Sequence, residues 1–441
     1  MAQRATQKTG TSVSRRQFIQ GSAASLAALG VVGSRLYAAG SDRIRVGLIG
    51  CGSRGTGAVR NCVDSSPNVE VTALGDLFQD RVDACLATIK KDGEKDWSSS
   101  QPWRHADKVK VTRETCFTGF DAYKKVIHSG VDLVILATAP HFRPVHLRAA
   151  IEAGKHVFME KPVAVDPVGI RSILQSSEMA KQKGLAIVAG TQRRHDPKYI
   201  EVIKRVHNGD LGELVAGQCY WVGCFVRQWG FYHDRQPGWT DMENQCRNWY
   251  YYTWLSGDHI VEQHVHNIDV INWAMGGHPV TAFGMGGRQV RIEPQFGNIY
   301  DHFAVEFEYA NGARILSMAR QIDGCTDRIG ERVVGTKGTA AEGLIEGAKP
   351  YKYDGPTPNP YEQEHADLIA SIRDGRPLNE GKQVAESTMT AILGRMSAYT
   401  GRAIKWDWAM NASKLDLTPP AYELGPVPAA PVPMPGKTQL V

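Results

Sequence analysis

The sequence predicts two domains: an N-terminal α/β domain with a parallel sheet, then an α+β domain with a mostly antiparallel, open sheet. A chain of 441 residues is too long for one ordinary hydrophobic core. Residues 131–137 form a continuous apolar run, as parallel strands do when both of their faces are buried. After about residue 211 the apolar runs alternate partly with polar residues, as half-buried strands do. These runs span residues 215–222, 280–290, 302–309 and 313–320.

Local signals add detail to this organisation. Asn311-Gly312 between the last two runs predicts a type I′ hairpin turn. The proline-rich end of the chain lacks periodicity, which indicates either an extended strap or a disordered tail. We expect a leader over residues 1–40, the α/β domain over 41–165, the α+β domain over 166–410 and the tail over 411–441.

A glycine-rich loop follows the first apolar strand. The strand ends in a G-x-G-x-x-G pattern whose glycines are Gly50, Gly52 and Gly55. The first glycine permits a tight turn, the second lets the backbone approach a pyrophosphate, and the third lets the next helix pack closely on the strand. The unpaired N–H groups of that helix would hold the pyrophosphate. The pattern predicts a Rossmann domain that binds a dinucleotide through Gly50, Gly52, Ser53, Arg54 and Gly55.

Two further residues are expected to contact this cofactor. Asp76 ends the second apolar strand, about 20 residues after the glycines. An acid at this position accepts hydrogen bonds from the adenosine ribose and repels a 2′-phosphate, which favours NAD over NADP. A helix N-cap is the alternative role for Asp76. Thr138 follows the run at 131–137 and is therefore expected at the carboxyl edge of the sheet, facing the cofactor.

The net charge of +5 arises entirely in the first forty residues. They contain Arg4, Lys8, Arg15, Arg16 and Arg35 and no acid, while the whole chain has 51 basic and 46 acidic residues (51 − 46 = 5). The remaining chain is therefore balanced. We expect neither a nucleic acid nor an anionic membrane as a partner.

The same forty residues resemble an export leader. Residues 14–19, SRRQFI, are similar to a twin-arginine signal, and a mildly apolar stretch follows over 21–32. That stretch is too short to span a bilayer. We expect export to the periplasm and no membrane span in the mature protein; a disordered basic N-terminus is the alternative.

The eight cysteines are expected to be buried free thiols. None forms a C-x-x-C pair. Cys219 and Cys224 are five residues apart in a strand-like run, which places them on opposite faces and argues against a disulfide.

A second motif follows the strand at 156–159, where Glu160-Lys161-Pro162 stands. With the glycine loop and the later sheet domain, it resembles the Gfo/Idh/MocA oxidoreductase family over roughly residues 42–405. The family's site helix usually reads G-G-G-x-L-x-D-x-G-x-H-x-x-D, and residues 256–269 align with it. The resemblance places the family acid on Glu262, its histidine on His266 and its last acid on Asp269. It implies an NAD(P)-dependent enzyme with catalytic residues Lys161, Glu262 and His266, and with Glu160 and Lys161 beside the cofactor.

Two departures from that pattern predict a reshaped substrate pocket. Glu262 replaces the usual Asp, and His264 stands where the family has Gly; His259 also enters the region. Positions 259, 262, 266 and 269 are three, four and three residues apart, so one helix would carry them as a stripe. We expect His259, His264 and Asp269 to contact the substrate. A surface stripe and a zinc site are the alternatives, and our prediction assigns no metal.

These residue types suit the oxidation of a secondary alcohol. The ordinary pKa of histidine, about 6.5, lets His266 accept the hydroxyl proton. Lys161 can stabilise the alkoxide, and Glu262 can hold His266 or the substrate. The sequence does not decide whether Lys161 or His266 is the base.

An aromatic segment between Trp229 and Trp254 predicts a carbohydrate site. Aromatic faces stack on sugar C–H groups while nearby polar groups bind hydroxyls. Trp249 and Tyr251 are the expected contacts, together with Arg193 after the strand at 186–190. An oligomer interface is the alternative, because aromatic residues and arginines are favoured there too.

The preferred interpretation is an NAD-dependent oxidoreductase that transfers hydride to or from a secondary alcohol of a sugar or sugar derivative. Relatives in the family carry out redox-neutral glycoside cleavage with a recycled cofactor, and that is the first alternative. A non-catalytic sugar-binding protein is the second. We also expect a homo-oligomer, a dimer or a tetramer.

Overall fold

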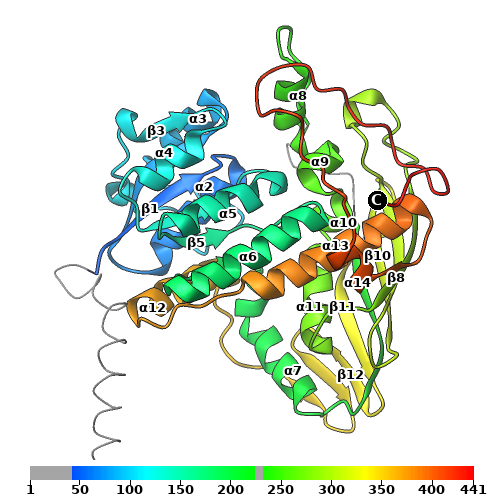
Figure 1. The fold of residues 1–441 in the computed structure, drawn as a ribbon. Helices are drawn as coiled ribbons and strands as arrows, with labels where there is room; N and C mark the ends of the chain where they lie inside the picture. The colour runs from blue at the N-terminus through cyan, green and yellow to red at the C-terminus, as the bar shows by residue number, and fades with distance from the viewer. Residues whose placement is uncertain (1–41, 224–231) are drawn as a thin grey trace, which may run out of the picture. The chain divides into compact units, whose positions relative to one another are not determined.

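The computed structural model describes residues 42–223 and 232–441. Its N-terminal part, blue to cyan in Figure 1, is built on a six-stranded sheet. The strand order is β3-β2-β1-β4-β5-β6, and every neighbouring pair is parallel. The predicted Rossmann sheet is therefore confirmed. Because β6 pairs with β5, this sheet extends beyond the expected boundary at residue 165 to Ala189. The strands are β1 (Ile44–Ile49), β2 (Val69–Asp76), β3 (Cys116–Thr118), β4 (Leu133–Leu136), β5 (His156–Met159) and β6 (Ile187–Ala189).

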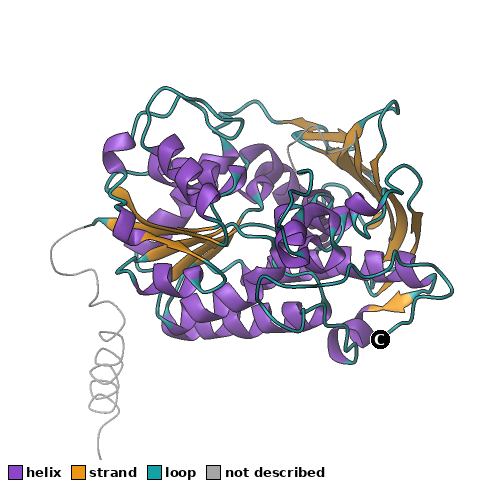
Figure 2. Ribbon diagram, turned by 90° about the horizontal axis from the view of Figure 1, so that it is seen from above, coloured by secondary structure: helices purple, strands orange, loops and turns teal. Residues whose placement is uncertain are grey.

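Helices cover both faces of this sheet (Figure 2). Their ends carry ordinary signals: Asp166 caps α6 by accepting from the Gly169 N–H at 2.7 Å, and Gly184 ends it with φ +65°. One covering helix, α12, comes from far along the chain and buries Leu368 and Ile369 in the same core as β1 and β2. The helices of this part are α2 (Ser53–Ser65), α3 (Gln79–Ile89), α4 (Ala122–His128), α5 (Arg143–Glu152), α6 (Pro167–Lys183) and α12 (Pro360–Arg373).

The second sheet has nine strands in the order β14-β13-β12-β11-β7-β10-β9-β8-β15. Only the β7–β10 pair is parallel, so the prediction of a mostly antiparallel sheet is confirmed. The strands are β7 (Leu214–Gly223), β8 (Thr281–Gly287), β9 (His302–Glu308), β10 (Arg314–Gln321), β11 (Arg328–Gly335), β12 (Gly338–Ala341), β13 (Leu344–Gly347), β14 (Tyr351–Lys352) and β15 (Ile404–Lys405).

The β9–β10 connection is a hairpin, as predicted, but its turn is not type I′. The Gly312 N–H donates to the Tyr309 carbonyl and the Tyr309 N–H donates to the Ala313 carbonyl, both at 2.9 Å. Gly312 alone has a positive φ, +82°, whereas a type I′ turn needs two such residues. The loop therefore has three residues, with the glycine in the left-handed position.

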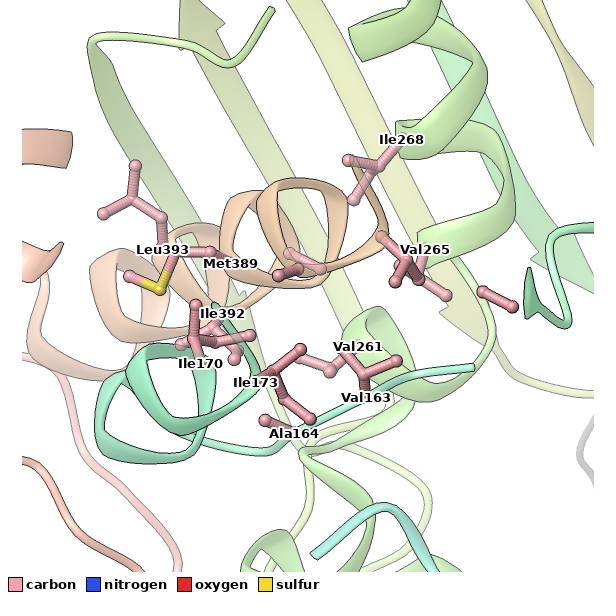
Figure 3. Close-up of a cluster of buried hydrophobic side chains, with 14 of the residues drawn as sticks. Val163, Ala164, Ile170, Ile173, Val261, Val265, Ile268, Met389, Ile392 and Leu393 are labelled. Atoms are coloured by element: carbon pink, nitrogen blue, oxygen red, sulfur yellow. The ribbon is translucent and has the colours of Figure 1, made fainter. Parts of the chain in front are cut away.

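Helices on one face of the second sheet connect it to the Rossmann part. The central one is α13, which lies nearly fully buried between α6 and β8. Apolar side chains from α6, α10, α11 and α13 pack together there (Figure 3), among them Ile173, Val261 and Met389. The helices of this part are α7 (Pro197–His207), α8 (Asp241–Arg247), α9 (Thr253–Ser256), α10 (His259–Glu262), α11 (Val265–Met275), α13 (Gly381–Thr400) and α14 (Trp406–Asn411).

The tail after α14 contains neither helix nor strand and runs along the body as a strap. The Leu417 N–H donates to Asp166 at 2.8 Å, Tyr422 bonds His141 at 2.8 Å, and the Pro433 carbonyl accepts from Tyr300 at 2.9 Å.

Seven of the eight cysteines lie in the described residues, and all seven are free thiols. Four are buried as expected, but Cys116 and Cys246 are half-buried and Cys325 is exposed. Cys224 lies outside the described residues, as does the predicted leader over residues 1–40. Within 42–223 and 232–441, no helix is both long and apolar enough to cross a bilayer.

Candidate active site

The glycine loop joins β1 to α2 and leaves space for a nucleotide. A Cβ on Gly50 would lie 2.4 Å from the Ala137 backbone, and one on Gly55 would lie 1.9 Å from the Gly50 carbonyl oxygen. Gly50 also has φ +105°. A Cβ on Gly52 would meet nothing within 4 Å, so the open space lies above the second glycine. This cradle beside the start of α2 fits the pyrophosphate of a dinucleotide.

Asp76 ends β2 and supports the glycine loop. One carboxylate oxygen accepts the Cys51 N–H at 2.7 Å and the other accepts the Phe78 N–H at 3.0 Å. Asp76 is not the N-cap of α3, which is Phe78. Each carboxylate oxygen keeps a lone pair for a ribose hydroxyl, and Asp76 lines the same groove as Gly52.

The groove has two walls. Thr138 lines the Rossmann wall; its carbonyl accepts from Arg143 at 2.7 Å. The opposite wall comes from the second sheet's part of the chain and includes His233, Arg247 and Trp249. Trp249, which was expected to contact the sugar, therefore lines the groove that begins at the glycine loop.

Arg54 and Glu160 connect the glycine loop to the residue before Lys161. The Arg54 guanidinium forms an ion pair with Glu160 and lies 3.5 Å from the buried Glu364. A Cβ on Gly190 would lie 2.4 Å from the Glu160 carboxylate. Glu160 therefore holds Arg54, which lines the groove at the glycine loop.

Lys161 and Glu262 form the centre of the site. Lys161 follows β5, at a cis peptide bond to Pro162. Its Nζ donates to the Glu262 carbonyl at 2.6 Å and to the Glu262 carboxylate at 3.0 Å. Both side chains are only about one-tenth exposed, at 11% and 9%. A charged ammonium in so dry a setting acts strongly on a nearby substrate oxygen.

His266 lies in the first turn of α11, and the charge of Lys161 acts on it. Burial lowers its pKa well below the ordinary value, and the cations Lys161, Arg193 and Arg54 lower it further. The imidazole is therefore neutral and keeps a lone pair for a proton. Its ring stacks on Trp221 of β7 with the centroids 5.8 Å apart. Trp221 is half-buried, and sequence reasoning missed it, because only the pairing of β7 against α11 brings it here.

The predicted single helix over 259–269 is in fact two helices, α10 and α11, separated by a turn at Gln263-His264. Only Glu262 and His266 of the expected stripe belong to the site. His259 is fully buried and packs on Phe303 with the ring centroids 5.1 Å apart.

His264 and Asp269 are also structural, contrary to expectation. His264 is fully buried and bonds Ser317 of β10 at 2.7 Å. Asp269 accepts two hydrogen bonds from Arg194, at 2.8 and 2.9 Å, and a third from Ser387 at 2.7 Å. Both side chains are buried and are held by partners within the core.

Arg193 remains a candidate for substrate contact. It is half-buried and its Nη1 lies 3.0 Å from Glu331 of β11, which also accepts from Asn267 at 2.7 Å. This ion pair holds the arginine beside His266, whose pKa it lowers.

The aromatic segment is mainly a hydrophobic core. Tyr251 is fully buried and packs with Tyr250, Phe296 and Ile299 in one cluster. This corrects the expectation that Tyr251 contacts a sugar: its ring is used for packing between elements. Trp229 and Phe231 lie outside the described residues.

His195 follows Arg193 and Arg194 in the chain, and its ion pairs should make the free energy of unfolding depend on pH. Burial opposes its charged form, but Asp367 at 2.6 Å and Glu380 at 3.3 Å overcome this and raise the pKa of His195 to about 10. A raised pKa stabilises the fold fully below about pH 6.5, and this stabilisation is lost as pH rises towards 10. Because Asp367 is partly exposed, we expect His195→Gln to cost about 2 kcal/mol at pH 6. Urea unfolding should show this difference shrinking towards zero by pH 10; a difference that is constant with pH would contradict it.

In the part of the chain that the structure describes, no group of three His, Cys, Asp or Glu side chains is arranged to hold a metal.

The glycine cradle and the Lys161–Glu262–His266 group together define an NAD-dependent oxidoreductase. The chain belongs to the Gfo/Idh/MocA oxidoreductase family. Residues 44–191 match its "Oxidoreductase family, NAD-binding Rossmann fold" domain, and residues 203–404 match its "Oxidoreductase family, C-terminal alpha/beta domain".

Known proteins similar to this chain include two inositol dehydrogenases. Inositol 2-dehydrogenase 1 of Saccharopolyspora erythraea is 29% identical over 176 residues, which cover 40% of this chain and 45% of that relative. The scyllo-inositol 2-dehydrogenase (NAD(+)) of Bacillus subtilis is 22% identical over 306 residues, covering 69% and 75%. The WlbA dehydrogenase from Bordetella pertussis, solved in complex with NADH and UDP-GlcNAcA, shares the fold with a TM-score of 0.62 and 17% identity, covering 82% of this chain and 97% of that one.

Proposed function

We propose that this enzyme transfers hydride between NAD and a secondary alcohol carbon of a sugar, a cyclitol or a related polyol. The observation that carries the proposal is the buried Lys161–Glu262 ion pair beside a neutral His266. The similarity to inositol dehydrogenases supports a polyhydroxylated ring as the substrate class.

NAD, when bound, supplies the hydride acceptor. The chain's residues supply the rest of the chemistry. Lys161 places a fixed positive charge where an alkoxide forms, while Glu262 holds its ammonium in position. The neutral His266 accepts the hydroxyl proton. The cations that lower its pKa also stabilise the alkoxide.

Trp221 is proposed as the surface on which the ring stacks. It lies on the inner face of β7, and its ring is held against His266. Sugar C–H groups favour such an aromatic face. Arg193, held by Glu331, would bind hydroxyls on the adjoining side.

The test is a panel of inositols, aldoses, uronic acids and nucleotide sugars, assayed by the absorbance of NADH. We expect at least one polyol to give NADH, and Trp221→Ala to raise KM much more than it lowers kcat. A protein that binds NAD but reduces it with no member of the panel would contradict the proposed substrate class.

We propose NAD rather than NADP as the physiological cofactor, because the Asp76 carboxylate lines the groove and repels a 2′-phosphate. Titration with both nucleotides tests this. Comparable affinities would contradict it and would indicate that Arg81, also in the groove, binds the phosphate.

A second candidate function is redox-neutral cleavage of a glycoside, in which a ring hydroxyl is oxidised only transiently. It is supported by the two-walled groove, which would hold a bound cofactor between residues of both parts of the molecule. Cleavage of a chromogenic glycoside without added NAD would support it, and NADH released in proportion to product would exclude it.

We propose a homodimer or a tetramer formed through the outer face of the second sheet. Strand register places the exposed Phe283, Met285, Leu316 and Met318 side by side on β8 and β10, across β9. Exposed apolar faces of this kind mark interaction sites. We expect Met285→Arg with Met318→Arg to convert the oligomer to a monomer in light scattering, while Leu378→Arg, an exposed residue elsewhere, leaves it unchanged.

We also propose export through the twin-arginine route, on the basis of residues 14–19 alone. Cell fractionation tests it. Replacing Arg15 and Arg16 by lysine should retain the protein in the cytoplasm, and unchanged export would contradict the proposal.

A further inference from the structure

The outer wall of the nucleotide groove bridges directly to the loop that follows Asp76. Its lining residues His233, Cys246, Arg247 and Trp249 belong to the stretch 232–251, here named the clamp segment. In it, Arg247 at the end of α8 donates through both Nη atoms to the carboxylate of Asp80, at 3.0 and 3.1 Å. The same guanidinium lies 3.9 Å from the centre of the Phe78 ring. Because Phe78 and Asp80 immediately follow Asp76, the bridge crosses the groove at its proposed ribose end.

A second bridge lies beside the first. His233 Nε2 is 2.9 Å from Arg81 Nη2, and both residues line the groove. The two parts of the molecule therefore meet at two adjacent contacts over Asp76. An occupant of the groove between Asp76 and the clamp segment would be covered on the side that otherwise faces solvent.

The geometry of Arg247 is fixed by its neighbours. Its Nε donates to Glu243 at 2.9 Å, one turn earlier on α8, and Trp239 lies on the guanidinium with its ring centre 4.9 Å away. A bidentate arginine–carboxylate pair with a preset arginine loses little side-chain entropy on forming. Glu243 and Trp239 thus orient the Arg247 guanidinium for its contact with Asp80.

The C-terminal tail holds the clamp segment from behind. The Met242 N–H donates to the Gly425 carbonyl at 3.1 Å, and Gln245 donates to the Val427 carbonyl at 2.5 Å. Both donors belong to α8, the helix that carries Arg247. The proline-rich tail therefore holds α8 in place through these two hydrogen bonds.

We propose that the clamp segment is a cofactor-retaining latch: the Arg247–Asp80 pair must open before the dinucleotide can leave the groove. This rests on the proposed function, since it takes the groove to be the NAD site. Retention would separate nucleotide exchange from turnover. It gives a physical basis for a cofactor that stays with the protein, which the redox-neutral candidate requires.

Nucleotide release, not activity, tests the latch. The purified full-length protein is loaded with NADH, freed of excess by gel filtration, and mixed with a large excess of NAD while the fluorescence of bound NADH is followed. We expect Arg247→Met and Asp80→Asn each to release NADH about fivefold faster than the wild type, the effect of losing a part-exposed bidentate pair. The double variant should be no faster than either single variant, because both remove the same contact.

Arg235→Met is the matched control. Arg235 belongs to the same segment but pairs with Asp241 at 2.9 Å, within the segment itself. Its loss should leave the release rate unchanged. Raising salt from about 0.1 to about 1 M, which shortens the screening length from about 10 to about 3 Å, should speed release from the wild type but not from the double variant.

The outcomes separate the two proposals. A wild type that binds NADH, with Arg247→Met and Asp80→Asn releasing it at the wild-type rate, overturns the latch and leaves the proposed function intact. A wild type that binds neither NADH nor NADPH overturns both. Asp80 is exposed, so Asp80→Asn tests the latch even where Arg247→Met lowers the melting temperature.

Discussion

Lys161→Met should lower kcat about a hundred- to a thousandfold while NAD still binds with nearly unchanged affinity. A loss in kcat of this size is typical when one preorganised charge that stabilises a developing oxyanion is removed. Lys161 Nζ contacts Glu262 and is nearly buried, so its charge is poorly screened. The glycine cradle lies on other elements and is unaffected. Steady-state rates on the best substrate of the panel, together with NADH titration, measure both quantities.

Two companion variants make this prediction specific. Glu262→Gln keeps a hydrogen-bond acceptor for Lys161 but removes the charge that fixes it, so an intermediate loss in kcat is expected. Lys181→Met removes a lysine that is exposed on α6 and should behave like the wild type. If Lys161→Met kept more than half of the wild-type kcat, the lysine would have no catalytic role and the proposed chemistry would be wrong.

The Rossmann half could be predicted from sequence because its signals are local. The glycine spacing follows from contacts between residues close in the chain. Position 55 requires glycine because the Cβ of any other residue would clash with the Gly50 carbonyl oxygen. Lys161 was predicted from the resemblance to the family, whose Glu-Lys-Pro motif follows a strand that is readable from the chain. Glu262 and His266 are four residues apart, a separation that survives the unexpected turn between α10 and α11.

The misassigned residues failed for a different reason: their roles depend on partners distant in the chain. The position of His264 in the motif predicts a site residue, but its ring is hydrogen-bonded to Ser317, which lies 53 residues later in the chain. Asp269 is bound by Arg194, 75 residues earlier. Trp221 was missed because β7 reaches His266 only after the sheet has formed. The periodicity of the sequence around one residue cannot predict which distant residue will contact it.

The same limit applies to the aromatic segment and to the clamp. Composition marks residues 229–254 as rich in aromatic and polar groups, but it does not distinguish a packed core from a binding face. Tyr251 joins the core, whereas Trp249 and Arg247 line the groove. The deciding factor is where α8 docks, and the Asp80 contact that fixes this lies 167 residues away.

Gly52→Val should weaken NAD binding about ten- to a hundredfold without destabilising the protein. No atom lies within 4 Å of a Cβ at this position, and its φ of −73° suits any residue. A valine therefore costs the apoprotein little, but it fills the space in which a pyrophosphate would approach the backbone. Overpacking of this kind costs about 1–3 kcal/mol, which corresponds to the expected range of affinities.

Two other glycine variants define the expected contrast. Gly277→Val is the matched control, because a Cβ there also meets nothing within 4 Å; both melting temperature and NAD affinity should stay at wild-type values. Gly55→Ala should lower the melting temperature as well as the affinity, since its Cβ would lie 1.9 Å from the Gly50 carbonyl oxygen. If Gly52→Val bound NAD as tightly as the wild type, the nucleotide would not pass over the second glycine. The whole site would then have to be placed elsewhere on the sheet, because Asp76, Arg54 and Glu160 are arranged around that one opening.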